Sequence, residues 1–177
     1  GTVLLPGEVF SFNGVVGERT KAGGYKPAAT YEGGKTVYTY GGGICQPSSS
    51  LYYCALLADL EIVERSNHGF VSSYMPYGMD ATVDWSGPNF RFKNNTNYPI
   101  KIDTESYDKN GVRRLKVTIY GTNEDGRYAV PTNNVFDEVV FRVKYLDETP
   151  EKLHGICVLN LAKVQYSKDW SQIRGCK

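Results

Sequence analysis

Residues 41–60 read GGGICQPSSSLYYCALLADL and join a run of three glycines to the strongest helical pattern in the chain. Apolar side chains recur at steps of three and four residues from Leu51 onward, and further leucines widen the apolar stripe around the helix. A helix that is apolar on nearly all faces is typical of a protein interior. Pro47 fits the first turn, where its missing N–H group costs nothing. The pattern predicts a buried helix over about residues 47–59.

The sequence on both sides of this helix favours β structure. Short alternating segments bounded by glycine, asparagine and aspartate predict strands. We expect strands over residues 9–12, 36–40, 62–63, 81–85, 89–93, 100–102, 115–120 and 139–145, with a turn at residues 108–111. The predicted fold class is α+β, mostly antiparallel β with one buried central helix. Because charges increase and glycines thin out after about residue 126, we expect a domain over residues 1–124 and a C-terminal β extension over 125–177 packed on it.

The composition excludes several classes of protein. The 177 residues are 41% hydrophobic and 22% charged, which is typical of a folded domain rather than a disordered segment. A net charge of +1 gives no basic surface for nucleic acid. No apolar run approaches the roughly 20 residues that a membrane-spanning helix needs. The chain begins at Gly1 without an initiator methionine or a signal peptide, which predicts a piece excised from a longer protein.

Cys45 lies where a nucleophile is expected, between the glycine turn and the N-terminus of the predicted helix. Unpaired backbone N–H groups and the positive end of the helix dipole favour a thiolate there, which predicts a lowered pKa. Glycines without a Cβ let a peptide backbone approach the sulfur. We expect the backbone N–H groups of Cys45 and Gln46, together with the Gln46 amide, to hold a developing oxyanion.

A nucleophilic cysteine needs a base, and His68 is the better placed of the two histidines in the chain. It follows the predicted helix and a short strand, which together return the chain to the start of the helix. We therefore expect His68 to contact Cys45. Asp80 ranks first as the group that orients the imidazole, ahead of Asp84 and Asn67.

Other interpretations of the cysteines stay open. Cys45 also suits a small buried hydrophobic side chain, and Cys54 is interpreted as core packing. A zinc site has suitable ligand types in Cys45, Cys54, His68, His154 and Cys157. Their spacing lacks the tight pairs of a zinc knuckle, so we expect no metal and no cofactor.

Cys157 and Cys176 near the C-terminus form a candidate disulfide. Such a bond would fix the C-terminal tail and would imply an oxidising, extracytoplasmic setting. Four cysteines allow three pairings, so the sequence leaves this pairing open.

Many short motifs resemble, in the same order, those of the VanW domain family. They are LPGEVFSFN at 5–13, GGY at 23–25, PA at 27–28, GGGICQ at 41–46, EIVER at 61–65, DATV at 80–83, FRF at 90–92 and NNT at 94–96. The resemblance covers roughly residues 4–120. Some members of the family act as peptidoglycan L,D-transpeptidases with the cysteine of the GGGIC motif as nucleophile. By resemblance, Cys45 is that nucleophile, His68 matches the family's histidine, and Asp80 lies in the matching Asp-Ala-Thr piece.

The resemblance implies a bacterial cell-wall enzyme that forms 3–3 cross-links through a Cys45 thioacyl-enzyme. Guanidinium forks suit the carboxylates of stem peptides, and aromatic side chains suit a peptide groove. The further residues expected to bind the substrate or the oxyanion are Gly43, Ile44, Gln46, Arg65, Tyr74 and Arg91. Two alternatives stay open: a cysteine L,D-carboxypeptidase or endopeptidase that acts on stem peptides, and a non-catalytic cell-wall-binding module.

The expected partners are peptidoglycan stem peptides, with no nucleic acid and no membrane contact by this segment. We expect a monomer. Its expected location is extracytoplasmic, in the cell wall or at the cell surface, as part of a longer secreted or membrane-anchored protein.

Overall fold

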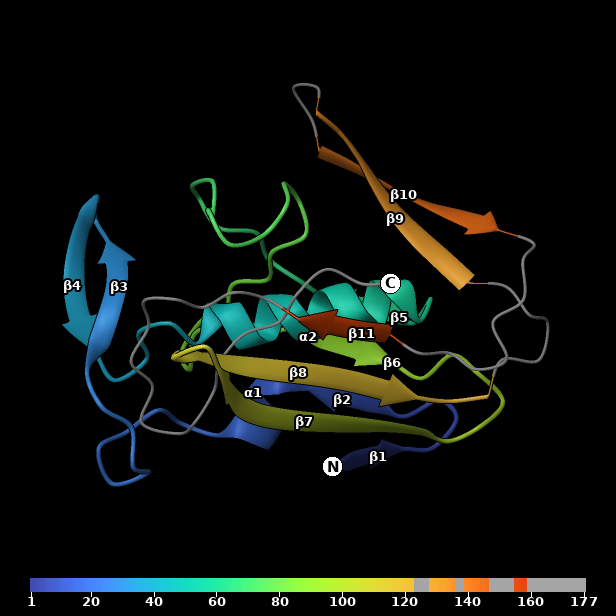
Figure 1. Ribbon diagram of the computed structural model, residues 1–177, viewed down its shortest axis with the longest axis horizontal. Helices are drawn as coiled ribbons and strands as arrows, with labels where there is room; N and C mark the ends of the chain where they lie inside the picture. Colours follow the sequence, from blue (N-terminus) through green and yellow to red (C-terminus); the bar gives the residue numbers. More distant parts are fainter. Residues whose placement is uncertain (123–127, 136–138, 147–154, 159–177) are drawn as a thin grey trace.

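The computed structural model describes residues 1–122, 128–135, 139–146 and 155–158 (Figure 1). The elements in these ranges are β1 (Thr2–Leu4), β2 (Val9–Ser11), α1 (Phe12–Val16), β3 (Ala28–Glu32), β4 (Lys35–Thr39), α2 (Cys45–Leu57), β5 (Glu61–Glu64), β6 (Arg91–Lys93), β7 (Ile100–Lys109), β8 (Val112–Tyr120), β9 (Tyr128–Val135), β10 (Val139–Leu146) and β11 (Gly155–Val158). Every strand pair among them is antiparallel. The predicted α+β class with mostly antiparallel strands is therefore confirmed.

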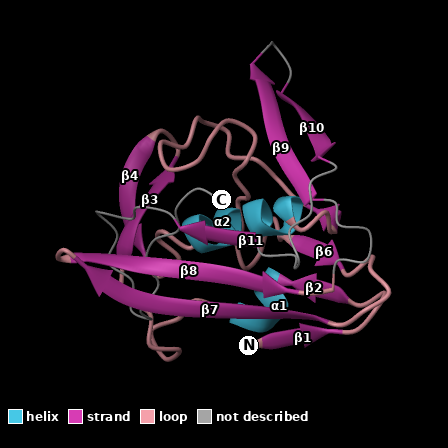
Figure 2. Cartoon of the chain, turned by 45° about the vertical axis from the view of Figure 1, so that its right-hand side comes forward, coloured by secondary structure: helices cyan, strands magenta, loops and turns pink. Residues whose placement is uncertain are grey.

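The strands form two sheets and two separate hairpins (Figure 2). The larger sheet has the order β1-β7-β8-β11, and the smaller one has the order β2-β6-β5. The hairpins are β3–β4 and β9–β10. The turn predicted at residues 108–111 joins β7 to β8, and Asn110 there adopts a left-handed φ of 56°.

Helix α2 lies at the centre of the molecule, beside β8 and β11 of the larger sheet and β5 of the smaller one (Figure 1). It begins two residues before the predicted start, so Cys45 is its first residue. Its side chains join those of both sheets in one core, whose largest fully buried apolar members are Phe90, Phe92, Ile100, Leu115, Ile119 and Val117. Burial of this apolar surface supplies the main driving force that holds the helix in place.

The glycine run before α2 is required by its geometry. Gly43 has a φ of 82°, a left-handed conformation that side chains with a Cβ rarely adopt. A Cβ on Gly42 would collide with the backbone carbonyl of Ala28 at the start of β3. The turn therefore brings the β3–β4 hairpin against the N-terminal end of α2.

The strand predicted over residues 81–85 is wrong, because the segment forms only an isolated bridge between Thr82 and Ser66. Its backbone is held by the helix instead. The Oγ of Ser49 accepts a hydrogen bond from the N–H of Ala81 at 2.9 Å and donates to the carbonyl of Cys45 at 2.6 Å. This hydroxyl fixes residues 81–83 against the first turn of α2.

Replacing Ser49 with alanine is expected to destabilise the fold by about 1–3 kcal/mol, because it leaves the buried N–H of Ala81 without its acceptor. Ser50→Ala is the matched control. Its hydroxyl is equally buried, but its hydrogen bond within the described residues stays inside the helix, to the carbonyl of Gln46. Urea unfolding of both variants measures the difference. Equal losses of stability would show that the link between Ser49 and Ala81 contributes nothing.

The segment after residue 124 contributes one strand to the larger sheet, since β11 pairs with β8. The division into residues 1–124 and 125–177 stays a prediction. Over the described ranges, neither helix has the length and apolar character needed to cross a bilayer.

Candidate active site

A groove of about 920 Å³ lies at the N-terminal end of α2. Its walls come from the β3–β4 hairpin, the glycine turn, residues 67–74 and residues 82–85. The rings of Tyr31 and Phe70 meet edge to face at 5.0 Å, which joins the hairpin to the 67–74 loop. Phe70 also lies 5.2 Å from the ring of His68. Aromatic side chains therefore form part of the groove wall, and Cys45 and His68 line the groove.

The Cys45 sulfur is surrounded by polar groups from residues 82 and 83. Its Sγ lies 3.4 Å from the hydroxyl of Thr82 and accepts from the N–H of Val83, also at 3.4 Å. Burial raises the pKa of the thiol, but hydrogen bonds to His68, Thr82 and Val83 outweigh burial and hold the pKa below its ordinary value. These contacts favour the thiolate, which is the nucleophilic form.

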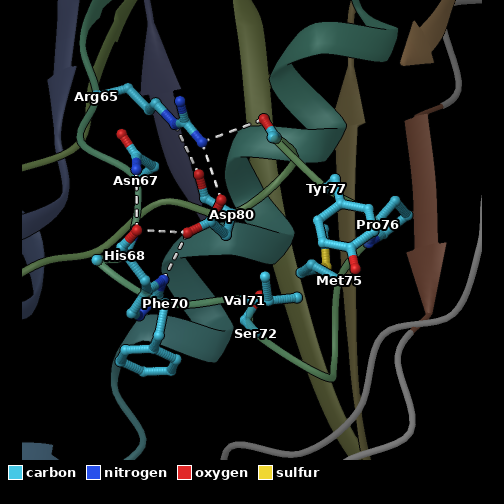
Figure 3. A pocket seen from close by; sticks show the side chains of 12 residues that line it. Arg65, Asn67, His68, Phe70, Val71, Ser72, Met75, Pro76, Tyr77 and Asp80 are labelled. Atoms are coloured by element: carbon cyan, nitrogen blue, oxygen red, sulfur yellow. Dashed lines mark hydrogen bonds and ion pairs between the residues drawn. The ribbon is translucent and has the colours of Figure 1, made fainter. Parts of the chain in front are cut away.

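His68 is fixed by Asp80 through two hydrogen bonds (Figure 3). The Nδ1 of the ring lies 2.6 Å from Oδ2 of Asp80, and the backbone N–H of His68 donates to the same oxygen at 2.7 Å. Burial lowers the pKa of His68, but the interactions with Asp80 and Cys45 raise it to about 9. The raised pKa of His68 and the lowered pKa of Cys45 both favour an imidazolium next to a thiolate.

Arg65 holds the other oxygen of Asp80 (Figure 3). Its Nη2 donates to Oδ1 at 2.9 Å, its Nε donates to the Asp80 carbonyl at 2.7 Å, and its guanidinium lies 5.2 Å from the ring centre of Tyr52. Burial raises the pKa of Asp80, but hydrogen bonds from His68 and the charge of Arg65 keep it below its ordinary value. Arg65 borders a second cavity of about 480 Å³ that also contacts His68, rather than the groove, and its hydrogen bonds hold Asp80.

Tyr74 contacts the ring nitrogen of His68 that Asp80 does not hold. Its hydroxyl is 3.3 Å from Nε2 of His68. Burial and the nearby charge of Cys45 raise the pKa of Tyr74, so its hydroxyl stays neutral. It can therefore donate to neutral His68 or accept from the imidazolium, whichever form is present.

The predicted oxyanion donors lie in the glycine turn, and two of their N–H groups are already used. The N–H of Ile44 donates to the carbonyl of Gly41 at 3.2 Å, and that of Gln46 donates to Gly43 at 3.1 Å. An oxyanion role for the Gln46 N–H would require this bond to open. The N–H of Cys45 belongs to the first residue of α2, on the same residue as the sulfur, and is the predicted donor that this leaves.

The remaining predicted residues lie elsewhere. Arg91 is on β6, 3.8 Å from Glu64, and does not line the groove. Cys54 is fully buried on α2. Cys157 lies on β11 and Cys176 lies outside the described residues, so their disulfide stays a prediction. In the described part of the chain, no group of three or more histidine, cysteine, aspartate or glutamate side chains could hold a metal ion.

Among the groove residues to which sequence reasoning gave no role are Thr82 and Arg19. Thr82 belongs to the DATV motif, but the strand expected there gave it no role. Arg19 follows α1 as a lone arginine, and no spacing or motif in the sequence connects it to Cys45.

The chain is similar over much of its length to proteins of one family. The model described as "VanW like protein" matches residues 1–120. YoaR of Bacillus subtilis (strain 168), an uncharacterized protein, is 44% identical over 121 residues, which is 68% of this chain and 39% of that protein. The vancomycin B-type resistance protein VanW of Enterococcus faecalis is 33% identical over 107 residues, 58% of this chain and 39% of that protein. The chain thus spans about two fifths of these relatives. No solved structure matches it.

Proposed function

This chain belongs to the VanW family, and on that premise we propose that it is a cysteine-dependent L,D-transpeptidase that forms 3–3 cross-links between peptidoglycan stem peptides. The relative named as a vancomycin B-type resistance protein supports a cell-wall-related role. An extracytoplasmic location, in the cell wall or at the cell surface, follows from this substrate.

The observation that carries the proposal is the row of contacts from Cys45 to Asp80. The sulfur interacts with His68, and Nδ1 of His68 lies 2.6 Å from Asp80. A nucleophile, a base and a group that orients the base are the parts that acyl transfer requires. They meet in a groove large enough for a peptide.

The first half of the reaction forms a thioester. The Cys45 thiolate attacks the carbonyl carbon that joins the third stem residue to a terminal D-alanine, and the N–H at the start of α2 faces the developing oxyanion. His68 gives its Nε2 proton to the leaving nitrogen. The C–N bond breaks, D-alanine departs, and the acyl group remains on the sulfur.

The second half transfers that acyl group. The side-chain amine of an acceptor stem attacks the thioester carbonyl, and neutral His68 accepts a proton from the amine nitrogen. A new C–N bond forms and the C–S bond breaks, which regenerates the thiolate and the imidazolium. One amide bond is exchanged for another, so the reaction needs no nucleotide or other energy source.

The direct test is incubation of the protein with a purified stem tetrapeptide, followed by intact-mass and peptide mass spectrometry. We expect an acyl adduct on Cys45 and release of one D-alanine for each adduct. Addition of an acceptor stem should then give 3–3 cross-linked dimers. A protein that forms neither adduct nor dimer would contradict the proposal.

The product distinguishes the alternatives. Shortened stems without dimers would identify a carboxypeptidase or endopeptidase, in which water resolves the thioester. Binding to cell walls without any adduct, unchanged when Cys45 is replaced, would identify a non-catalytic binding module.

A further inference from the structure

Arg19 is a buried cation on the wall of the groove. Only 8% of its surface is exposed, although it lies in an irregular segment after α1 and lines the same groove as Cys45. Its Nη1 donates to the carbonyl of Gly17 at 3.0 Å. Among the described residues, no acceptor forms a hydrogen bond with its Nη2. Buried guanidinium groups normally have their donors satisfied, so this atom indicates a missing partner.

No carboxylate of the described chain fills that place. Asp84 is near enough to interact electrostatically with Arg19, but it is exposed and accepts a hydrogen bond from Ser86 at 3.0 Å. No ion pair joins Arg19 to Asp84 or to any other carboxylate of the described residues. Burial lowers the pKa of Arg19, opposed by the charges of Tyr25, Asp84 and Cys45, and the guanidinium stays cationic at neutral pH. The charge of Cys45 therefore acts on Arg19 across the groove.

We propose that Arg19 binds the terminal carboxylate of the donor stem peptide, on the leaving-group side of Cys45. This inference rests on the proposed function. In a stem tetrapeptide that carboxylate is separated from the scissile nitrogen by a single carbon atom, so it must lie close to any thiolate that attacks the bond. A carboxylate there completes the hydrogen bonds of the guanidinium. Because Nη2 is shielded from solvent in this structure, the guanidinium must turn slightly when the carboxylate binds.

The inference sets a length requirement for the donor. A pentapeptide cleaved at the same bond would place its carboxylate one residue farther away, about 3.6 Å along an extended chain. Arg19 would then face a peptide carbonyl instead of a carboxylate. The groove is therefore selective for donors that end directly after the scissile bond.

The first experiment compares the tetrapeptide donor with the same peptide carrying a C-terminal amide. With the unaltered protein, acylation of Cys45 should be at least tenfold slower for the amide. In the Arg19→Gln variant the rate of acylation by the acid should fall at least tenfold. The rate with the amide should change little, since the amide has no charge for Arg19 to bind. Arg113→Gln is the matched control, because this exposed arginine pairs with Asp108 on β7 and does not line the groove. Equal rates for acid and amide in the unaltered protein would overturn the proposal.

The second experiment does not depend on transpeptidation. Iodoacetate and iodoacetamide both alkylate Cys45 when the thiolate displaces iodide and forms an S–C bond, but only iodoacetate carries a carboxylate. The rate with iodoacetate divided by the rate with iodoacetamide should fall at least fivefold in Arg19→Gln. It should fall much less in Arg19→Lys, which keeps the positive charge. The lysine variant also provides a test if the glutamine variant fails to fold. If no donor acylates the protein but this ratio falls, the proposed function fails and the anion site stands. If both rates fall by the same factor, Arg19 acts on the thiol itself and the carboxylate site is refuted.

Discussion

Replacing Cys45 with alanine is expected to remove acyl-enzyme formation and 3–3 cross-linking, with a loss of about 10³-fold or more that brings the rate to background. The change deletes the sulfur that attacks the carbonyl and adds no atom to the groove. The fold should persist, because Cys45 is only partly buried at the edge of the core and its hydrogen bonds to Thr82 and Val83 are long. Mass spectrometry of the protein with a tetrapeptide donor, and chromatography of the muropeptides, measure both losses.

Cys54→Ala is the matched control for this variant. Cys54 lies on the same helix, but it is completely buried and its thiol faces the carbonyl of Val117 on β8 at 3.8 Å. We expect this variant to keep the Cys45 adduct and the dimers, with at most a lower stability. Formation of cross-linked dimers by Cys45→Ala would show that Cys45 is not the nucleophile. Their loss from Cys54→Ala alone, in a folded protein, would do the same.

The sequence predicted the helix and the place of Cys45 at its start because both are local. The apolar pattern after residue 51 defines α2, and the glycine turn before Cys45 has a conformational reason that a sequence reader can recognise. The β7–β8 pair was predictable for the same reason, since its turn lies between two alternating segments. These features depend on neighbours a few residues apart.

The parts that the sequence did not predict depend on contacts between distant residues. The segment 81–85 alternates like a strand, but the buried serines of α2 take its hydrogen bonds and leave it as a wall of the groove. Arg65 is compatible in sequence with a substrate carboxylate, but Asp80, 15 residues later, already binds it. Arg19 enters the groove only because the loop after α1 folds back toward α2. Neither the contact of Arg65 with Asp80 nor the approach of Arg19 to α2 produces a periodic pattern in the sequence.

Asp80→Asn is expected to reduce the rate of Cys45 acylation at neutral pH by about 10²- to 10⁴-fold. The amide cannot supply the charge that supports imidazolium, so the pKa of His68 should fall from about 9 toward its ordinary value near 6.5. The imidazole is then mostly neutral at pH 7.5, the thiol loses its cationic partner, and its pKa rises. Less thiolate is present, and no proton is ready for the leaving nitrogen.

The charge states of Cys45 and His68 determine how reactivity and stability depend on pH. In the unaltered protein the reactive ion pair exists above the lowered pKa of Cys45 and disappears as the pH rises through about 9, where His68 loses its proton. Stability follows the same group. Because the pKa of His68 is raised by folding, its contribution is complete below about pH 6.5 and is lost as the pH rises through about 9. In Asp80→Asn this loss of stability between pH 6.5 and 9 should largely vanish.

Nuclear magnetic resonance titration of the imidazole measures the cause directly, and iodoacetamide alkylation of Cys45 against pH measures its consequence. The chain has two histidines, so a His154→Ala background leaves the His68 signal alone. Asp108→Asn is the matched control, since Asp108 also pairs with an arginine, Arg113, but both side chains are exposed and neither lines the groove. A His68 midpoint that stays near 9 in Asp80→Asn would show that another group holds the proton. An unchanged acylation rate alongside a lowered midpoint would show that the imidazolium is not needed for attack, and the mechanism would then need a different acid.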